Sequence, residues 1–201
     1  MRIGFDFDNT IVSYDELFHK VALEQGVVPT TTPISKLAVR DYLRGIDKED
    51  IWTEMQGYVY GARMEEAQSY VGVIDFIRHA KAAGHTLAIM SHKTKQNYLG
   101  TPYDLHAAAR KWIQRYLCDE GELLIPNDHV FFEVTKEDKL ARIGKFSCDM
   151  FIDDLPEILL APTFPSSTQR YLFDPQQHHQ DKTLDNVNIF SSWQGLKSCL
   201  K

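Results

Sequence analysis

Cysteine is scarce in this chain of 201 residues: Cys118, Cys148 and Cys199 stand far apart. No CxxC spacing occurs, so the sequence favours neither a zinc site nor a disulfide framework. No apolar run approaches the roughly 20 residues that a transmembrane helix requires. The first residues, MRIGFDFD, turn acidic early and contain no long apolar segment. We therefore expect no signal peptide and a cytoplasmic location.

Positive charge is also in short supply. The chain has 22 lysines and arginines against 28 aspartates and glutamates, giving a formal net charge of −6. Because nucleic-acid and anionic membrane surfaces attract basic proteins, we expect neither as a partner. No GxGxxG follows any predicted strand, which argues against dinucleotide binding. Nothing in the sequence specifies an oligomeric state.

The sequence does contain an alternation of short apolar runs and amphipathic segments. Strands are predicted at 3–7, 86–90, 129–134, 149–153 and 170–174, and helices at 71–85, 103–117 and 137–146. Strands that alternate with helices are typical of a parallel sheet. We therefore expect an α/β fold: a three-layer Rossmann-like parallel sheet with helices on both faces.

One long block interrupts this alternation. Residues 14–69 contain three helix-like segments and no convincing strand. This is more chain than a single crossover between two strands needs. We therefore expect an α/β core domain at 1–13 and 70–201, with 14–69 inserted as a small helical cap.

Two aspartates follow the first predicted strand, in FDFDNT. Asp6 and Asp8 are two residues apart, so an extended backbone places them on the same face. Neighbouring carboxylates repel and raise each other's pKa unless a cation lies between them. The pair therefore favours a metal site or acid–base chemistry over a charged turn.

Polar residues follow the other strands as well. Ser91 follows the second strand, Lys136 and Lys139 the third, and Asp153 and Asp154 the fourth. The carboxyl ends of parallel strands meet at one edge of the sheet, so we expect these residues to converge with the first aspartate pair. Carboxylates suit Mg²⁺, and a hydroxyl beside an ammonium suits the oxygens of an anion. The set predicts a phosphoryl-transfer site.

The segments DFDNT, IMSHKT, the lysine of EDK and FIDDLPE resemble, in order, the four motifs of the haloacid dehalogenase-like (HAD) superfamily. The resemblance covers about 1–13 and 70–174, and the helical block lies where this family commonly inserts a small cap. It implies a Mg²⁺-dependent phosphatase that forms an aspartyl-phosphate intermediate. The implied substrate is a small phosphorylated metabolite, either a sugar phosphate or a nucleotide-like phosphomonoester.

The resemblance also implies catalytic and metal-binding roles. Asp6 would be the nucleophile, and Asp8 would be the general acid and base. Both would contribute to Mg²⁺ binding, Asp8 through its backbone carbonyl. Asp154 would be the direct metal ligand at the fourth strand, with Asp153 supporting the metal through water. Because dehalogenases and phosphonatases of the family lack the second aspartate, Asp8 favours phosphate esters.

Phosphate binding is implied for three further residues: Ser91, His92 and Lys139. Lys139 is preferred because it follows acidic residues in EDK, and Lys136 is the alternative. The fourth motif lacks a further aspartate four residues on, where Ile158 stands, although many members of the family have the paired aspartates alone. Tyr58, Arg63 and Lys93 are candidates for substrate specificity, because aromatic and basic side chains suit a sugar phosphate or a nucleotide.

Other functions remain open at this level. The same aspartyl-phosphate would serve a phosphotransferase or mutase that excludes water from the site. A HAD fold that has lost catalysis would serve as a binding module. A two-component receiver domain carries similar residues in a different order, and the order in this sequence opposes that interpretation.

Overall fold

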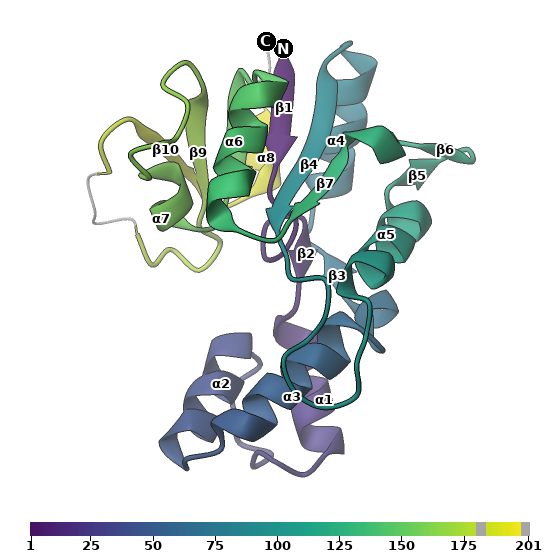
Figure 1. Ribbon diagram of the computed structural model, residues 1–201, viewed down its shortest axis with the longest axis vertical. Coiled ribbons are helices and arrows are strands. Elements are labelled where there is room, and N and C mark those ends of the chain that lie inside the picture. The colour runs from purple at the N-terminus through teal and green to yellow at the C-terminus, as the bar shows by residue number, and fades with distance from the viewer. Residues whose placement is uncertain (180–183, 198–201) are drawn as a thin grey trace. The chain divides into compact units, whose positions relative to one another are not determined.

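The computed structural model describes residues 1–179 and 184–197, and the chain divides into two compact units (Figure 1). The α/β unit comprises Met1–Val12, Ser69–Lys93 and Leu117–Lys201, and the helical unit comprises Ser13–Gln68 and Thr94–Tyr116. This division differs from the predicted one, because residues 94–116 group with the helical block instead of with the core. The indole Nε1 of Trp112 donates to the carbonyl of Ala67 at 2.8 Å, which fixes this segment within the helical unit.

The α/β unit is built on a six-stranded sheet in which every neighbouring pair is parallel. Its strand order is β10-β9-β8-β1-β4-β7. The strands are β1 (Arg2–Phe5), β4 (Thr86–His92), β7 (Val130–Glu133), β8 (Met150–Asp153), β9 (Gln169–Phe173) and β10 (Val187–Phe190). The five predicted strands are confirmed. The short edge strand β10, whose residues are mostly half-buried, was not predicted.

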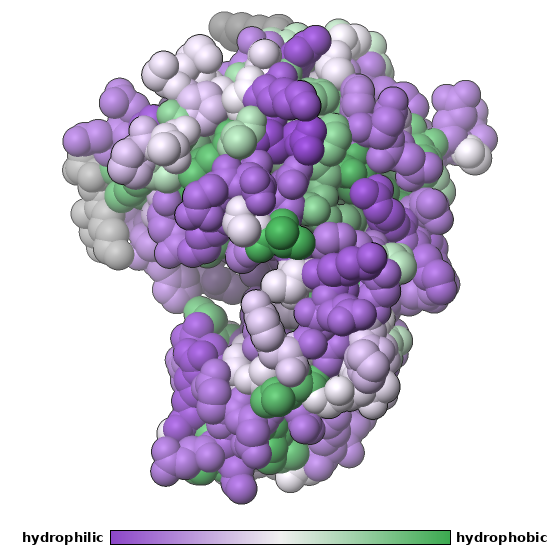
Figure 2. Space-filling view, in the orientation of Figure 1, coloured by the Kyte–Doolittle hydropathy of each residue, from purple (hydrophilic) through white to green (hydrophobic). Residues whose placement is uncertain are grey.

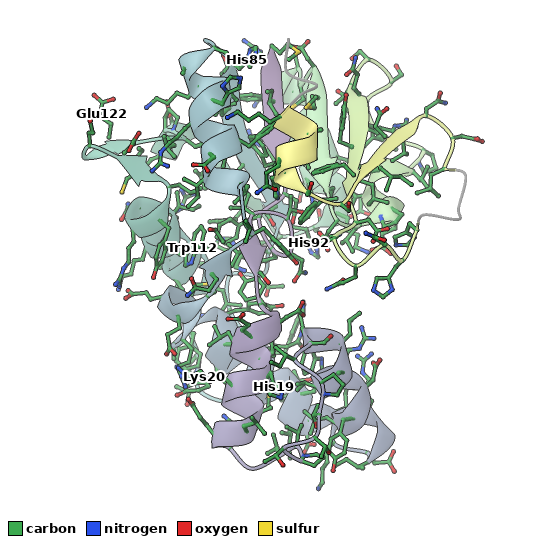
Figure 3. The ribbon with its side chains drawn as sticks, turned by 180° about the vertical axis from the view of Figure 1, so that it is seen from behind. His19, Lys20, His85, His92, Trp112 and Glu122 are labelled. Atoms are coloured by element: carbon green, nitrogen blue, oxygen red, sulfur yellow. The ribbon has the colours of Figure 1, made fainter. Side chains whose placement is uncertain are left out.

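Helices cover both faces of this sheet, as Figures 1 and 3 show from opposite sides. They are α4 (Val73–Ala82), α6 (Lys136–Phe146), α7 (Pro156–Leu159) and α8 (Trp193–Lys197). On the α6 and α7 face, Leu140 and Ile143 join a buried cluster with Phe151. On the opposite face, the rings of Phe76 and Trp193 pack 5.1 Å apart between centroids. The predicted three-layer α/β fold is confirmed.

Gly4 on β1 leaves room for the side chains of Phe151 and Cys148 on the face of the sheet that α6 covers. A Cβ at this position would lie 2.6 Å from Cδ2 of Phe151 and 2.9 Å from Sγ of Cys148, which is too close for real atoms. Because side chains two residues apart in a strand share a face, Asp6 follows Gly4 on the side that α6 covers. The sequence of β1 therefore points the first aspartate of the motif at this helix.

The helical unit contains α1 (Asp15–Glu24), α2 (Lys36–Gly45), α3 (Glu49–Tyr60), α5 (Leu105–Tyr116) and the 3₁₀ turn η1 (Met64–Glu66). Ser35 begins α2 by accepting hydrogen bonds from Leu37 N and Ala38 N at 3.2 and 3.4 Å. The core of the helical unit is aromatic: the ring centroids of Phe18 and Trp52 lie 4.9 Å apart. The predicted helices of 14–69 are thus present.

One glycine in α3 and another directly after it let the segment after β4 pack against that helix. A Cβ on Gly57 would lie 2.5 Å from Nδ2 of Asn97, and one on Gly61 would lie 2.4 Å from Cβ of Tyr103. Asn97 also accepts a hydrogen bond from Tyr103 N at 2.9 Å. These contacts order residues 97–103 within the helical unit.

The smaller elements are two short β pairs and one 3₁₀ turn. β2 (Val12–Ser13) pairs with β3 (Gln68–Ser69), β5 (Cys118–Asp119) pairs with β6 (Glu122–Leu123), and η2 is Asn127–His129. On the face drawn in Figure 2, hydrophilic residues predominate and apolar residues stand as scattered spots. Across the described helices, none has both the length and the apolarity to cross a bilayer.

Candidate active site at the carboxyl edge of the sheet

The register between β1 and β8 brings two aspartates together. Gly4 pairs with Phe151 and Phe5 with Ile152, and Asp6 N donates to Ile152 O at 2.8 Å. Asp6 lies two residues after Gly4, and Asp153 lies two residues after Phe151. The two aspartates therefore lie side by side at the ends of adjacent strands, on the face that α6 covers. Both are buried, with 5% and 0% of their surface exposed.

Lys139 lies between these two carboxylates. Its Nζ is 2.6 Å from Oδ1 of Asp6 and 2.6 Å from Oδ2 of Asp153, and the side chain is almost fully buried. Thr135 begins α6 by accepting a hydrogen bond from Asp138 N at 3.0 Å, which sets the start of the helix that carries the lysine. Lys136, the alternative from the sequence, is exposed and forms an ion pair with Glu157 instead.

Burial dominates the electrostatics of this cluster. It raises the pKa of Asp6 to about 7, with Asp153 and Asp8 acting in the same direction and Lys139 opposing them. Burial would lower the pKa of Lys139, but the negative charges of Asp153 and Asp6 outweigh it, so that pKa is raised. The lysine is therefore positively charged, and the cluster holds more carboxylates than ammonium groups.

Asp8 lies in a tight turn that follows β1. Asn9 adopts a left-handed conformation with φ of 59°, which asparagine tolerates better than most residues. The turn is closed by hydrogen bonds from Ile11 N and Val12 N to Phe7 O at 3.0 and 3.1 Å. Lys93, which follows β4, places its Nζ 3.0 and 2.7 Å from the two carboxylate oxygens of Asp8.

Asp154 completes an acidic group that could hold a metal ion. One carboxylate oxygen from each of Asp6, Asp153 and Asp154 lies within 4.8 Å of the others. The hydroxyl of Thr10, which is fully buried, donates to Oδ1 of Asp154 at 3.3 Å. Asp153 also accepts from Leu155 N at 2.9 Å, so both of its oxygens already have donors within the protein. Hard oxygen ligands of this kind suit a divalent cation such as Mg²⁺.

Ser91 and His92 sit at the end of β4 but differ in environment. Ser91 is 1% exposed, and within 1–179 and 184–197 its Oγ has no hydrogen-bond partner. A buried hydroxyl without a partner is costly, and it points to a ligand that supplies one. His92 is exposed, and its Nε2 donates to Val134 O at 3.1 Å (Figure 3). Its predicted phosphate-binding role stays a prediction.

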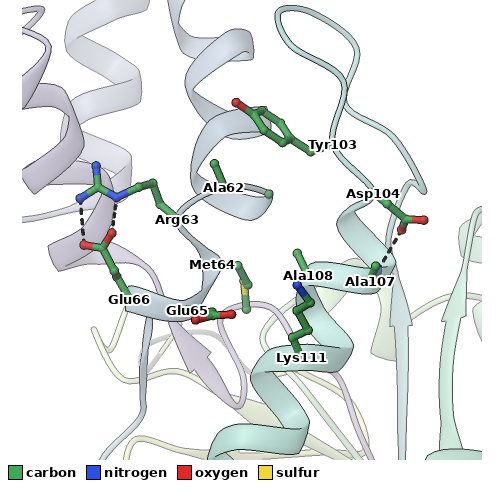
Figure 4. A pocket seen from close by; sticks show the side chains of 11 residues that line it. Ala62, Arg63, Met64, Glu65, Glu66, Tyr103, Asp104, Ala107, Ala108 and Lys111 are labelled. Carbon is green, nitrogen blue, oxygen red and sulfur yellow. Dashed lines mark hydrogen bonds and ion pairs between the residues drawn. The ribbon is translucent and has the colours of Figure 1, made fainter.

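Two residues predicted to determine specificity lie in the helical unit. Arg63 donates to Glu66 and, at 2.6 Å, to Oε2 of Glu24, so its charge is balanced by two carboxylates. Figure 4 shows the guanidinium and Glu66 facing each other beside a cavity of about 510 Å³ that Tyr103 and other residues of this unit line. The ring of Tyr58 lies under the same guanidinium, 5.7 Å from centroid to Cζ. Their role in specificity stays a prediction.

Two contacts of the site were missed by sequence reasoning. Lys93 was considered only for specificity, and its pairing with Asp8 joins residues that are 85 positions apart. The bond from Thr10 to Asp154 was also not foreseen. The position of Lys93, two residues after Ser91 and therefore on the same side of an extended chain, was the available signal.

Comparisons with known proteins place the fold. No family model matches the chain. A curated protein of Oceanobacillus iheyensis, named "Putative nucleotidase OB0422", is 18% identical over 189 residues, covering 90% of each chain. A HAD family hydrolase from Deinococcus radiodurans, solved with bound phosphate and sodium, has a TM-score of 0.62 at 13% identity. That match covers 99% of this chain and 94% of the other.

Two further solved structures are similar over their full length. A phosphoserine phosphohydrolase-like protein from Francisella tularensis has a TM-score of 0.60 at 14% identity, covering 100% of this chain and 99% of that one. A predicted phosphoglycolate phosphatase from Haemophilus somnus has a TM-score of 0.56 at 16% identity, covering 100% and 97%. These likenesses, together with the parallel sheet and the motif residues at its carboxyl edge, show that the chain has the fold of the haloacid dehalogenase-like superfamily.

Proposed function

We propose that this protein is a Mg²⁺-dependent phosphatase that hydrolyses a small phosphorylated metabolite through an aspartyl-phosphate on Asp6. The observation that carries the proposal is the buried cluster in which Lys139 lies between Asp6 and Asp153. Asp154 stands close enough to share a metal with both aspartates. The Oγ of Ser91, which has no hydrogen-bond partner among the described residues, adds a donor for a phosphoryl oxygen.

The metal site in this proposal uses three carboxylates of the cluster. Asp6 and Asp154 would hold Mg²⁺ directly, because Asp153 already accepts from Lys139 and Leu155 N. Asp153 would support the metal through a water molecule. The backbone carbonyl of Asp8 would complete the set of protein ligands. When bound, Mg²⁺ supplies positive charge that offsets the carboxylates and the phosphoryl oxygens.

The first half of the reaction forms the aspartyl-phosphate. A carboxylate oxygen of Asp6 attacks phosphorus, and the bond from phosphorus to the leaving oxygen breaks. Asp8 gives a proton to that oxygen, so the product leaves as an alcohol. Ser91 and Lys139 hold the transferring group, and burial of Lys139 keeps its charge effective because little water screens it.

The second half returns the enzyme to its starting state. Asp8, now a carboxylate, takes a proton from a water molecule as its oxygen attacks phosphorus. The bond between phosphorus and the Asp6 oxygen breaks, which releases inorganic phosphate and restores the Asp6 carboxylate. Asp8 suits this alternation because its side chain is 20% exposed, whereas Asp6 and Asp153 are closed off from solvent.

The substrate class in this proposal is a sugar phosphate or a nucleotide-like phosphomonoester. Tyr58 and Arg63 are proposed to contribute to its selection. The name of the Oceanobacillus relative places nucleoside monophosphates on the panel that should be tested.

The test is phosphate release from a panel of sugar phosphates, nucleoside monophosphates and small phosphorylated acids. Each compound is assayed with Mg²⁺ and with EDTA, for the wild type, Asp6→Asn and Asp128→Asn. Asp128 is an exposed aspartate of η2 and serves as the matched control. We expect metal-dependent release that Asp6→Asn abolishes and Asp128→Asn leaves unchanged.

Other outcomes of this assay distinguish the alternatives. Release that appears only when a sugar acceptor is withheld, with transfer to the acceptor when it is present, would identify a phosphotransferase or mutase. Release that persists in folded Asp6→Asn would contradict the assignment of the nucleophile. Binding of panel compounds without turnover would indicate a binding module.

A further inference from the structure

Each aspartate of the DFD motif contacts a different buried lysine. Asp6 contacts Lys139 of α6, and Asp8 contacts Lys93, which follows β4. The Lys93 side chain is only 4% exposed. Because a buried ammonium is costly without a partner, the position of Lys93 depends on Asp8.

The contact between Lys93 and Asp8 involves both carboxylate oxygens. Nζ lies 2.7 Å from Oδ2 and 3.0 Å from Oδ1, so the ammonium faces the carboxylate end-on. Two short charge-assisted bonds limit rotation of the carboxylate in a way that a single bond does not. The side chain of Asp8 is 20% exposed, whereas that of Lys93 is buried. The lysine therefore contacts the carboxylate from the interior of the protein and leaves part of Asp8 open to solvent.

The backbone of Lys93 is itself fixed. Its N–H donates to Glu133 O at 2.8 Å, which continues the hydrogen bonding between β4 and β7 by one residue. Phe7 packs beside the ammonium, with its ring centroid 5.8 Å from Nζ. The lysine therefore reaches Asp8 from a rigid strand end, and the turn that carries Asp8 is closed by its own backbone bonds.

A buried ion pair is weak evidence for a stabilising role, because an apolar pair of similar size often stabilises as well. Orientation of Asp8 is the role that the geometry favours. We propose that Lys93 is a positioning residue that holds the ionised Asp8 carboxylate in place to activate water in the second half of the reaction. This inference rests on the proposed phosphatase function, and it offers an alternative to direct recognition of substrate by Lys93.

The test is a double-mutant cycle with p-nitrophenyl phosphate as the probe. This ester releases a stable phenolate, so formation of the aspartyl-phosphate needs little help from a proton donor, whereas its hydrolysis still needs Asp8. Lys93→Met, Asp8→Asn and the double variant are compared with the wild type. Lys145→Met, at an exposed position of α6, is the control for loss of a lysine. Circular dichroism checks that each variant is folded.

We expect Lys93→Met to lower kcat about tenfold or more and to lower KM with it, so that kcat/KM for this probe stays within about threefold of the wild type, because only hydrolysis of the intermediate is slowed. Rapid mixing should show a burst of about one p-nitrophenolate per enzyme, followed by slow turnover, in Lys93→Met and in Asp8→Asn alike. The double variant should be no slower than the slower single variant, because residues that act as a unit are not additive. If Lys93→Met fails to fold, Lys93→Gln, which keeps one donor on a shorter side chain, enters the same cycle.

Four results would overturn the inference. A rise in KM with unchanged kcat would show that Lys93 binds the substrate. Multiplying losses in the double variant would show that Lys93 and Asp8 act independently, and an unchanged kcat would show that Lys93 is not needed. A wild type that turns over neither this probe nor any panel compound would refute the proposed function itself, and the inference with it. That result is separable from the others because only it affects the wild type.

Discussion

Lys139 places its ammonium 2.6 Å from the carboxylate of Asp6, a residue 133 positions earlier in the chain. The contact is sealed from solvent, since Lys139 is 1% and Asp6 5% exposed. The same ammonium touches Asp153, so a single cation links the ends of β1 and β8. The stability of this sheet edge and the chemistry proposed for it therefore depend on the same residue.

Lys139→Met should destabilise the α/β unit strongly when Mg²⁺ is absent. The substitution preserves most of the volume but leaves Asp6 and Asp153 as buried carboxylates without their cation. Removing one partner of a buried ion pair costs about 3–5 kcal/mol. The free energy of unfolding, measured by urea denaturation in EDTA, gives the comparison with wild type. Lys145→Met is the exposed control, and equal stability of the two variants would contradict the burial of the pair.

Thr10→Val should weaken binding of Mg²⁺. The substitution preserves shape but removes the hydroxyl that donates to Oδ1 of Asp154 at 3.3 Å. Loss of a hydrogen bond that orients a metal ligand commonly lowers metal affinity about 10–100-fold. Titration of the thermal midpoint with Mg²⁺ measures the affinity without requiring activity. Thr10→Ser retains the hydroxyl and should bind Mg²⁺ like the wild type; weakening in both variants would point to packing instead.

Gly4→Ala should destabilise the fold through steric overlap. The added Cβ would lie 2.6 Å from Cδ2 of Phe151 and 2.9 Å from Sγ of Cys148, so these side chains or the strand must shift. Overpacking of this kind costs about 1–3 kcal/mol. Gly144→Ala is the matched control, because its Cβ would meet only Pro165 at 3.4 Å and it lies within α6. It should stabilise the protein by about 0.5–1 kcal/mol, since alanine favours helix over glycine. Thermal denaturation ranks the three proteins, and a neutral Gly4→Ala would contradict the packing.

Cys148 should resist alkylation in the native protein. Burial raises the pKa of its thiol to about 12, with Asp149 adding to the shift and Arg2 opposing it, so the reactive thiolate is scarce at neutral pH. Cys118 is half-buried and should react first with iodoacetamide. Peptide mass spectrometry after timed labelling, with and without urea, distinguishes the two sites. Rapid native labelling of Cys148 would mean that the α6 face opens. Cys199 lies outside the described residues.

The strand-end residues were predictable because a polar or charged residue of the set follows each of these apolar strands. Asp6, Ser91, Lys139 and Asp153 each follow an apolar run, and parallel strands bring their carboxyl ends to one edge. The preference for Lys139 over Lys136 as the lysine of this cluster agrees with its contacts in the structure. Alternation of strands and helices was enough to predict the parallel sheet and its two covered faces.

Pairings between side chains were beyond the sequence. The sequence places Lys93 on the same side of the chain as Ser91, but its pairing with Asp8 depends on the register of β4 against its neighbours, which the pattern of residues does not fix. The grouping of 94–116 with the helical unit depends on contacts such as Gly57 against Asn97, which require two backbones to approach closely. The strand β10 was missed because an edge strand with half-buried residues carries a weak apolar signal.

The most direct measurement is to trap the intermediate on Asp6. Asp8→Asn should form the aspartyl-phosphate from p-nitrophenyl phosphate and hydrolyse it slowly, because the base for water is missing. Rapid acid quenching followed by peptide mass spectrometry should then show one phosphoryl group on the peptide that contains Asp6. The label should be absent when Mg²⁺ is removed and in the Asp6→Asn, Asp8→Asn double variant. Phosphate release by the wild type without a phosphoryl group on Asp6, or with one on another residue, would contradict the proposed mechanism.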